Sequence, residues 1–156
     1  MKEEDEKYMW RCIQLSEKAF ELGDNPFGCV IAGKNGIVVE ARNKIKENDT
    51  TNHAEILAMR AAQKFLKTSD LSEYTIYSNC EPCPMCAFMM RELKFKRVVF
   101  AVLSLQMGGY SKWNILEDKE LIRFKPFFSN PPKVVTGILE KEVIAIFKEM
   151  GWKMYR

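Results

Sequence analysis

The stretch YTIYSNCEPCPMCAFMMRELKFKRVVFAV, residues 74–102, contains the pattern that decides the fold. Its first part, YTIYS (74–78), is rich in β-branched and aromatic residues and predicts a strand. The middle part, CPMCAFMMREL (83–93), predicts a short buried helix, and RVVFAV (97–102) predicts another strand. Strands and helices that alternate along so short a stretch are typical of a sheet covered by helices.

The flanking segments extend this alternation in both directions. Before it, FGCVIAG (27–33) and IVVEAR (37–42) surround the turn residues KNG and predict a hairpin. The segment from His53 to about Lys67 has one narrow polar stripe and predicts a largely buried helix. After it, KVVTGIL (133–139) predicts a last strand.

Apolar stripes at helical spacing predict a helix at each end of the chain, the first of which Gly23 terminates. The stripes are Tyr8, Cys12, Leu15, Ala19 and Leu22 in the first helix, and Val143, Ile146, Phe147 and Met150 in the last. No repeat, low-complexity tract or linker interrupts the sequence. We therefore predict one domain, residues 1–156, with an α/β fold: a three-layer α/β/α sandwich around a mixed sheet of about five strands.

The composition indicates the compartment in which this domain acts. Apolar and charged residues make up 47% and 29% of the 156 residues, and no apolar run approaches the roughly 18 residues of a membrane span. The opening MKEEDEKYMW is acidic and polar, unlike a signal peptide. Five cysteines, three of them bunched, fit a reducing compartment and a metal or reactive site, so we expect a cytoplasmic protein.

The charge balance bears on possible partners. A net charge of +3 without a domain-wide basic stripe argues against nucleic acid as the main partner. The basic residues near the end of the chain, Lys148, Lys153 and Arg156, are expected on a solvated face.

Two cysteines and the only histidine suggest a metal site. Cys83 and Cys86 are three residues apart at a strand-to-helix junction, so both side chains point from one face of the first turn. His53 begins a different helix, and both helix N-termini can point at one ion. Two thiolates and one imidazole, with a fourth position left to water, form a catalytic zinc set.

Glu55 distinguishes a reactive site from a structural one. It lies in the same first helical turn as His53, where its carboxylate can reach the mouth of the metal site. A carboxylate there can take a proton from water, pass it to a ring nitrogen and later protonate a leaving amine. Glu55 is therefore the candidate catalytic residue.

These motifs resemble those of a known family. HAE (53–55) followed by PCPMC (82–86) matches the H-x-E and P-C-x-x-C signature of zinc-dependent deaminases. The chain is similar to the cytidine deaminase superfamily, in particular to the branch of guanine deaminases, free-base cytosine deaminases and tRNA adenosine deaminases. The likeness covers most of the domain and runs through NPFGCVIAG (25–33), EARN (40–43), NDTTNHAEILAMRAA (48–62), SNCEPCPMC (78–86) and KRVVF (96–100).

The resemblance implies roles for individual residues. His53, Cys83 and Cys86 resemble the zinc ligands of the family, and Glu55 resembles its proton shuttle. Asn43 resembles a substrate-binding asparagine, and the backbone of Ala54 resembles the amide that contacts the reacting base.

The resemblance also implies an activity and an assembly. It implies a hydrolytic deaminase that releases ammonia from a nucleobase, nucleoside or related amino-heterocycle. NPFG (25–28) resembles the guanine deaminase branch, so guanine is the first expected substrate and cytosine or cytidine the second. The segment AVLSLQMGGYSKWNIL (101–116) lacks the patterns of both tRNA adenosine deaminases and guanine deaminases after the matching strand.

Members of this branch commonly build pockets beside a subunit interface, so we expect a homodimer. The apolar CAFMMREL helix with Phe95 supports this expectation, because it offers more apolar surface than one sheet face needs.

Several alternatives remain open from the sequence. A lone histidine is usually a core or surface residue whose ring is hydrogen-bonded and has no catalytic role. A CxxC motif that opens a helix also occurs in thioredoxin-like redox sites. Cys80 could complete a closed site of three cysteines and one histidine, which would make the protein a non-catalytic zinc module. If the protein is an enzyme, a tRNA adenosine-to-inosine deaminase is the alternative to a deaminase of free bases or nucleosides.

Other candidate residues have structural explanations. Asn43 could be a turn former, and Cys12 and Cys29 fit small core positions. Phe27 is a candidate for stacking on a substrate base, as are Trp113 and Phe127, although aromatic residues in such patterns are more often in the core.

Overall fold

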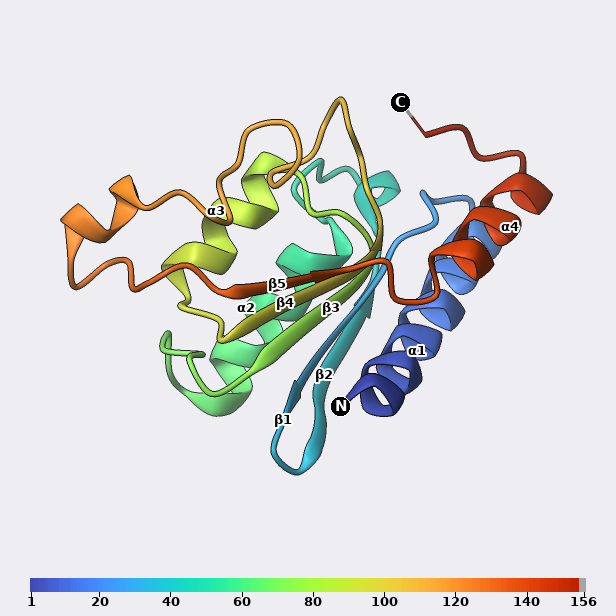
Figure 1. Ribbon diagram of the computed structural model, residues 1–156. Coiled ribbons are helices and arrows are strands. Elements are labelled where there is room, and N and C mark those ends of the chain that lie inside the picture. The colour runs from blue at the N-terminus through green and yellow to red at the C-terminus, as the bar shows by residue number, and fades with distance from the viewer. Residues whose placement is uncertain (155–156) are drawn as a thin grey trace.

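One mixed sheet of five strands forms the centre of the molecule in the computed structural model, which describes residues 1–154 (Figure 1). The strand order is β2-β1-β3-β4-β5. β1 pairs antiparallel with β2 and β3, whereas β3, β4 and β5 are parallel. The strands are β1 (Gly28–Gly33), β2 (Gly36–Arg42), β3 (Thr75–Cys80), β4 (Arg97–Val102) and β5 (Lys133–Thr136).

Two pairs of helices cover the two faces of this sheet (Figure 1). α1 (Lys2–Glu21) and α4 (Glu140–Met150) lie on one face, and α2 (Ala54–Leu66) and α3 (Pro84–Glu92) lie on the other. The predicted three-layer α/β/α sandwich with five strands is confirmed. Two short 3-10 helices, Ile45–Glu47 and Glu120–Phe124, lie in the connections.

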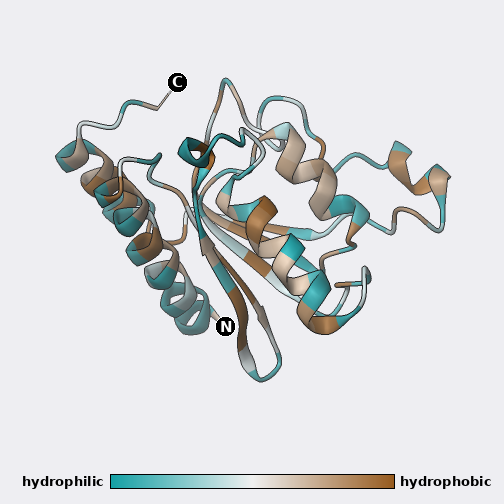
Figure 2. Cartoon of the chain, turned by 180° about the vertical axis from the view of Figure 1, so that it is seen from behind, coloured by the Kyte–Doolittle hydropathy of each residue, from teal (hydrophilic) through white to brown (hydrophobic). Residues whose placement is uncertain are grey.

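The period-2 alternation of the strands divides the core into two clusters. In β1, Cys29 and Ile31 face α2 and α3, whereas Val30 and Ala32 face α1 and α4. Figure 2 shows hydrophobic colouring on the strands between the helical layers and many hydrophilic residues along α1. No helix among residues 1–154 is both long enough and apolar enough to cross a membrane.

Two boundaries differ from those that the sequence predicts. Leu22 was expected in the buried stripe of α1, but the helix ends at Glu21 and Leu22 is 55% exposed. The last strand was expected to reach Leu139, but it ends at Thr136 because Gly137 adopts a φ of +82° and turns the chain toward α4. Lys148 and Lys153 are exposed as expected, and Arg156 lies outside the described residues.

The parallel strands determine where the connecting segments meet. β3 and β4 are joined through α3, so the segments that follow both strands emerge at the same edge of the sheet. The backbone N–H of Glu81, directly after β3, donates to the carbonyl of Val102 at the end of β4 over 2.8 Å. Open α/β sheets bind ligands beyond the carboxyl ends of their strands, and the candidate site lies at this edge.

Candidate active site

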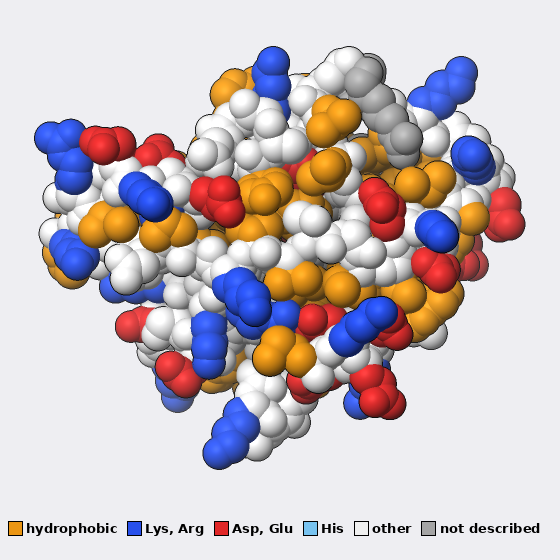
Figure 3. Space-filling model, in the orientation of Figure 1, with side chains coloured by type: hydrophobic (Ala, Val, Ile, Leu, Met, Phe, Trp, Pro, Cys, Tyr) orange, Lys and Arg blue, Asp and Glu red, His pale blue; other side chains and the backbone are white. Residues whose placement is uncertain are grey.

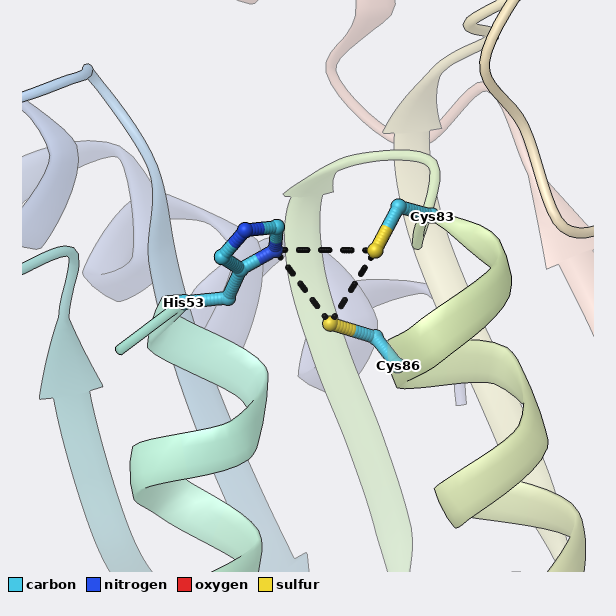
Figure 4. A group of neighbouring side chains, drawn as sticks. All are labelled: His53, Cys83 and Cys86. Atoms are coloured by element: carbon cyan, nitrogen blue, oxygen red, sulfur yellow. Dashed lines mark hydrogen bonds between the residues drawn. The ribbon is translucent and has the colours of Figure 1, made fainter. Parts of the chain in front are cut away.

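His53, Cys83 and Cys86 converge on one point at the N-termini of two helices (Figure 4). His53 is the N-cap of α2 and Cys83 is the N-cap of α3, where Pro84 occupies the first helical turn. The Nδ1 atom of His53 lies 3.5 Å from Cys83 Sγ and 3.6 Å from Cys86 Sγ. The two sulfur atoms are 3.6 Å apart.

This donor set fits a zinc ion. Ligand atoms at tetrahedral corners around zinc, with Zn–S near 2.3 Å and Zn–N near 2.0 to 2.1 Å, are about 3.5 to 3.8 Å apart. The three separations in the protein match that spacing, and the residue types are those that zinc prefers. His53, Cys83 and Cys86 are therefore positioned to bind a metal, and three ligands are the number typical of a catalytic zinc.

The cysteine–histidine cluster favours the anionic form of one thiol. Hydrogen bonding with Cys86, and then with His53, lowers the pKa of Cys83 to about 4 despite burial. The hydrogen bond with Cys83 in turn raises the pKa of His53. Since the thiolate is the metal-binding form of cysteine, Cys83 is prepared as a ligand at neutral pH.

Glu55 lies beside the metal-binding cluster in a buried position. Only 5% of it is exposed, and its Oε2 lies 3.8 Å from Cys86 Sγ. Its Oε1 accepts a hydrogen bond from the Ser78 hydroxyl over 3.0 Å. Burial, and then the charge of Cys83, raises the pKa of Glu55 above its ordinary value. A carboxyl with a raised pKa is suited to accept and return protons near neutral pH.

A cavity of about 340 Å³ opens in front of this cluster. His53, Glu55 and Cys83 form one side of it, and Phe27 belongs to its wall. Stacking of Phe27 on a substrate base stays a prediction. The remaining lining residues come from the end of β3, from three connections and from the segment after α4, and they are Asn25, Cys80, Glu81, Ser104, Met107, Trp152, Lys153 and Met154.

Asn43 and Ala54, the two other candidate substrate contacts, are bonded to each other. The side-chain Oδ1 of Asn43 accepts a hydrogen bond from the backbone N–H of Ala54 over 3.0 Å. The amide nitrogen of Asn43 donates to Asp24 Oδ1 over 3.2 Å, and Asn43 is 2% exposed. In this arrangement Asn43 supplies the first N–H of α2 with an acceptor and so holds His53 at the helix start. Substrate contact by Asn43 or Ala54 stays a prediction.

The other candidate cysteines and aromatic residues lie outside the metal-binding group. All five cysteines are free, and Cys12 and Cys29 are buried in the core. Cys80 lines the cavity, but within residues 1–154 the metal-binding group comprises only His53, Cys83 and Cys86, which argues against a closed four-ligand site. Trp113 and Phe127 are 50% and 66% exposed and do not line the cavity.

Sequence reasoning missed a residue that contacts Glu55, Ser78, and among the cavity residues it missed Glu81 and Trp152. Ser78 is one polar position in a strand, Glu81 directly precedes the PCPMC motif, and Trp152 follows the last helix. The polar residues inside and next to a predicted buried strand were a signal for Ser78 and Glu81, because buried polar groups need partners. No local pattern indicated that Trp152 returns to the site.

Comparison with known proteins identifies the family. Residues 2–102 match the cytidine and deoxycytidylate deaminase zinc-binding region. The chain belongs to this family of zinc-dependent deaminases, enzymes that cleave C–N bonds by hydrolysis. The recognition of the cytidine deaminase superfamily and of its zinc-binding region from the two motifs is confirmed.

Individual relatives differ in the substrates that their names give. The tRNA-specific adenosine deaminase of Bacillus subtilis is 34% identical over 96% of this chain and 92% of its own length. A probable cytosine deaminase of Schizosaccharomyces pombe is 32% identical over 92% of this chain and 90% of its own. The solved structure of guanine deaminase from Bacillus subtilis is 28% identical, with a TM-score of 0.62, and covers 97% of this chain and 98% of that chain.

Proposed function

We propose that this deaminase acts on a small amino-substituted heterocycle, with Glu55 as the residue that moves protons. The observation that carries the proposal is the buried carboxylate of Glu55, 3.8 Å from Cys86 Sγ and on the same cavity as His53 and Cys83. A closed structural zinc would have no use for a buried carboxylate at this position.

His53, Cys83 and Cys86 would hold the zinc ion. When bound, zinc would act as a Lewis acid and lower the pKa of a water molecule. Glu55 Oε2 faces the cluster, while Ser78 holds Oε1 and fixes the orientation of the carboxylate. Glu55 takes one proton from the attacking water and delivers it to the ring nitrogen. It then takes the second proton, from the hydroxyl now bonded to the ring carbon, and passes it to the amine, which leaves as ammonia as the C–N bond breaks and the C=O bond forms. Its raised pKa, caused mainly by burial, suits each of these transfers.

The cavity and the surface charge support a free base or nucleoside as substrate. A volume of about 340 Å³ is at the small end of ligand pockets, and Phe27 offers an aromatic face for a heterocycle. Figure 3 shows basic and acidic side chains interspersed on the face in view, without a continuous basic surface. We propose guanine as the first substrate to test and cytosine or cytidine as the second.

A tRNA substrate is the second candidate. The observation in its favour is the 34% identity with a tRNA-specific adenosine deaminase across nearly the whole chain. Such a substrate would bind through its phosphates and show a steep decrease in affinity with salt.

We also propose a homodimer formed through α3. This helix exposes Met85 and Phe88, at 38% and 45%, beyond what the sheet face covers. Phe95 was expected to add to this apolar surface, but it is only 2% exposed and belongs to the core. A cytoplasmic location likewise stays a prediction.

Ammonia release from guanine, cytosine, cytidine and an adenosine-containing anticodon stem-loop tests the substrate proposal. We expect turnover of a free base or nucleoside that disappears in the Glu55→Gln variant. Activity only on the stem-loop, declining steeply with salt, would favour the tRNA candidate instead. A protein that contains zinc but deaminates none of the four would contradict the proposal of a small heterocyclic substrate.

A further inference from the structure

Glu81 is a buried carboxylate outside the metal-binding cluster. It follows β3 directly and precedes the turn that contains Cys83, and only 4% of it is exposed. Within residues 1–154 no Lys or Arg side chain forms an ion pair with it. A buried carboxylate is costly unless other donors satisfy it.

Donors from a single loop satisfy this carboxylate. Oε2 accepts hydrogen bonds from the Ser104 backbone N–H over 2.6 Å and from the Ser111 hydroxyl over 2.8 Å. Oε1 accepts the backbone N–H groups of Tyr110 and Ser111 over 3.0 and 2.6 Å. Four hydrogen bonds thus attach both ends of the segment 104–111 to one side chain.

This segment forms part of the cavity wall. It also contacts the turn of Pro82 and Cys83 that leads into α3, called the metal-binding turn below. Ser104 and Met107 line the cavity. The backbone N–H of Gly109 donates to the Pro82 carbonyl over 2.8 Å. A Cβ atom at Gly109 would lie 3.0 Å from the carbonyl oxygen of Cys83, so the loop approaches the turn of this zinc ligand closely.

We propose that Glu81 is a positioning residue. It holds the segment 104–111 in place as a wall of the substrate cavity and in contact with the metal-binding turn. The segment has neither helix nor strand structure, so its shape depends on these side-chain hydrogen bonds. That substrate occupies this cavity rests on the proposed function. The attachment of the loop by Glu81 does not.

Gly108 provides an independent means to displace the same contact. A Cβ atom at Gly108 would collide with both carboxylate oxygens of Glu81. The φ angle of Gly108 is outside the left-handed region, so alanine is acceptable to the backbone itself. Gly108→Ala should therefore displace the loop through Glu81 and have little effect once that carboxylate is removed.

The experiment compares Glu81→Gln, Glu81→Ala, Gly108→Ala and the double variant Glu81→Ala/Gly108→Ala. Glu117→Gln, at an exposed glutamate of the same connection, is the matched control. Three quantities are measured: the zinc-to-protein ratio, the amide hydrogen exchange of peptides that cover 103–112, and kcat and KM on whichever of the tested substrates releases ammonia.

We expect zinc to remain bound in all variants. Exchange in 103–112 and KM should each rise about tenfold or more in the three single variants, because each loses or displaces hydrogen bonds to a charged acceptor. The value of kcat should change far less than KM. Gly108→Ala should add little in the Glu81→Ala background, a non-additivity that identifies contact between the two residues.

Unchanged exchange in Glu81→Gln, or additive effects of the two substitutions, would overturn the proposal. A joint loss of zinc and kcat at constant KM would also overturn it, because Glu81 would then only support the metal-binding turn. Hydrogen exchange needs no substrate, so it decides whether Glu81 holds the loop even if no tested compound is deaminated. That last result would count against the proposed function alone.

Discussion

Glu55 is the residue whose chemistry is most directly testable. Glu55→Gln keeps the shape of the side chain but cannot accept a proton, so we expect turnover to fall by about 10³- to 10⁴-fold, at the upper end for a general acid–base group. Zinc content and the folded state should be unchanged, because Glu55 is not among the three grouped ligands. Rate measurements with parallel metal analysis check this. A rate close to that of the unmodified protein would remove Glu55 from the mechanism.

The cysteines differ in their expected effect on metal content. Cys83→Ser removes one of three grouped ligands, so we expect loss of most of the zinc, whereas Cys80→Ser should retain about one ion per chain. Cys80 is buried in the cavity wall and serves as the matched control for a thiol-to-hydroxyl change. Metal analysis after zinc-replete expression gives the ratio. Equal loss in both variants would indicate a closed four-ligand site.

At the scale of elements, an ion pair between a buried aspartate and a partly buried arginine attaches α1 to the sheet. Arg97 of β4 donates two hydrogen bonds to Asp5 of α1, over 3.0 and 2.8 Å, and the Tyr77 hydroxyl donates a third over 2.8 Å. Asp5→Asn leaves the Arg97 charge without a partner. Because Arg97 is partly exposed, we expect a loss of about 2 to 4 kcal/mol in the free energy of unfolding, below the full cost for a buried pair. Denaturant unfolding measures it.

The same pair predicts a pH dependence. Burial alone would raise the pKa of Asp5, but the hydrogen bonds from Arg97 and Tyr77 outweigh it and lower the pKa below the ordinary value of 3.8. A depressed pKa contributes stability above the unfolded-state pKa, which is lost as pH falls through the lower folded-state value. The stability difference between the unmodified protein and Asp5→Asn should therefore be constant near neutral pH and shrink below about pH 4. A difference that grows in acid would contradict this assignment.

At the scale of the whole molecule, the exposed face of α3 predicts assembly. We expect light scattering to give a dimer mass at micromolar concentration and Phe88→Glu to shift it toward the monomer, because a charge would be buried in the interface. Phe65→Glu, at an even more exposed aromatic residue on α2, is the control and should leave the mass unchanged. A monomer in the unmodified protein would count against the dimer.

The layers of the fold and the metal chemistry could be predicted from the sequence because their signals are local. Alternating and helical apolar patterns placed the strands and helices, and their buried faces form the two core clusters. The CxxC spacing puts Cys83 and Cys86 within one helical turn, and His53 and Glu55 lie within another. Residue type and short spacing determine which atoms can bind zinc or move a proton.

The walls of the cavity were decided by tertiary structure. Glu81 and Ser104 meet because parallel strands bring their carboxyl ends to one edge of the sheet, although the residues are far apart in the chain. Trp152 reaches the site only because α4 packs on the opposite face and its C-terminus turns toward Phe27, where the two rings contact edge to face. These contacts join distant segments and leave no periodic pattern in either one. The sequence by itself thus determined the reaction chemistry, whereas the long-range contacts decided the shape of the cavity that receives the substrate.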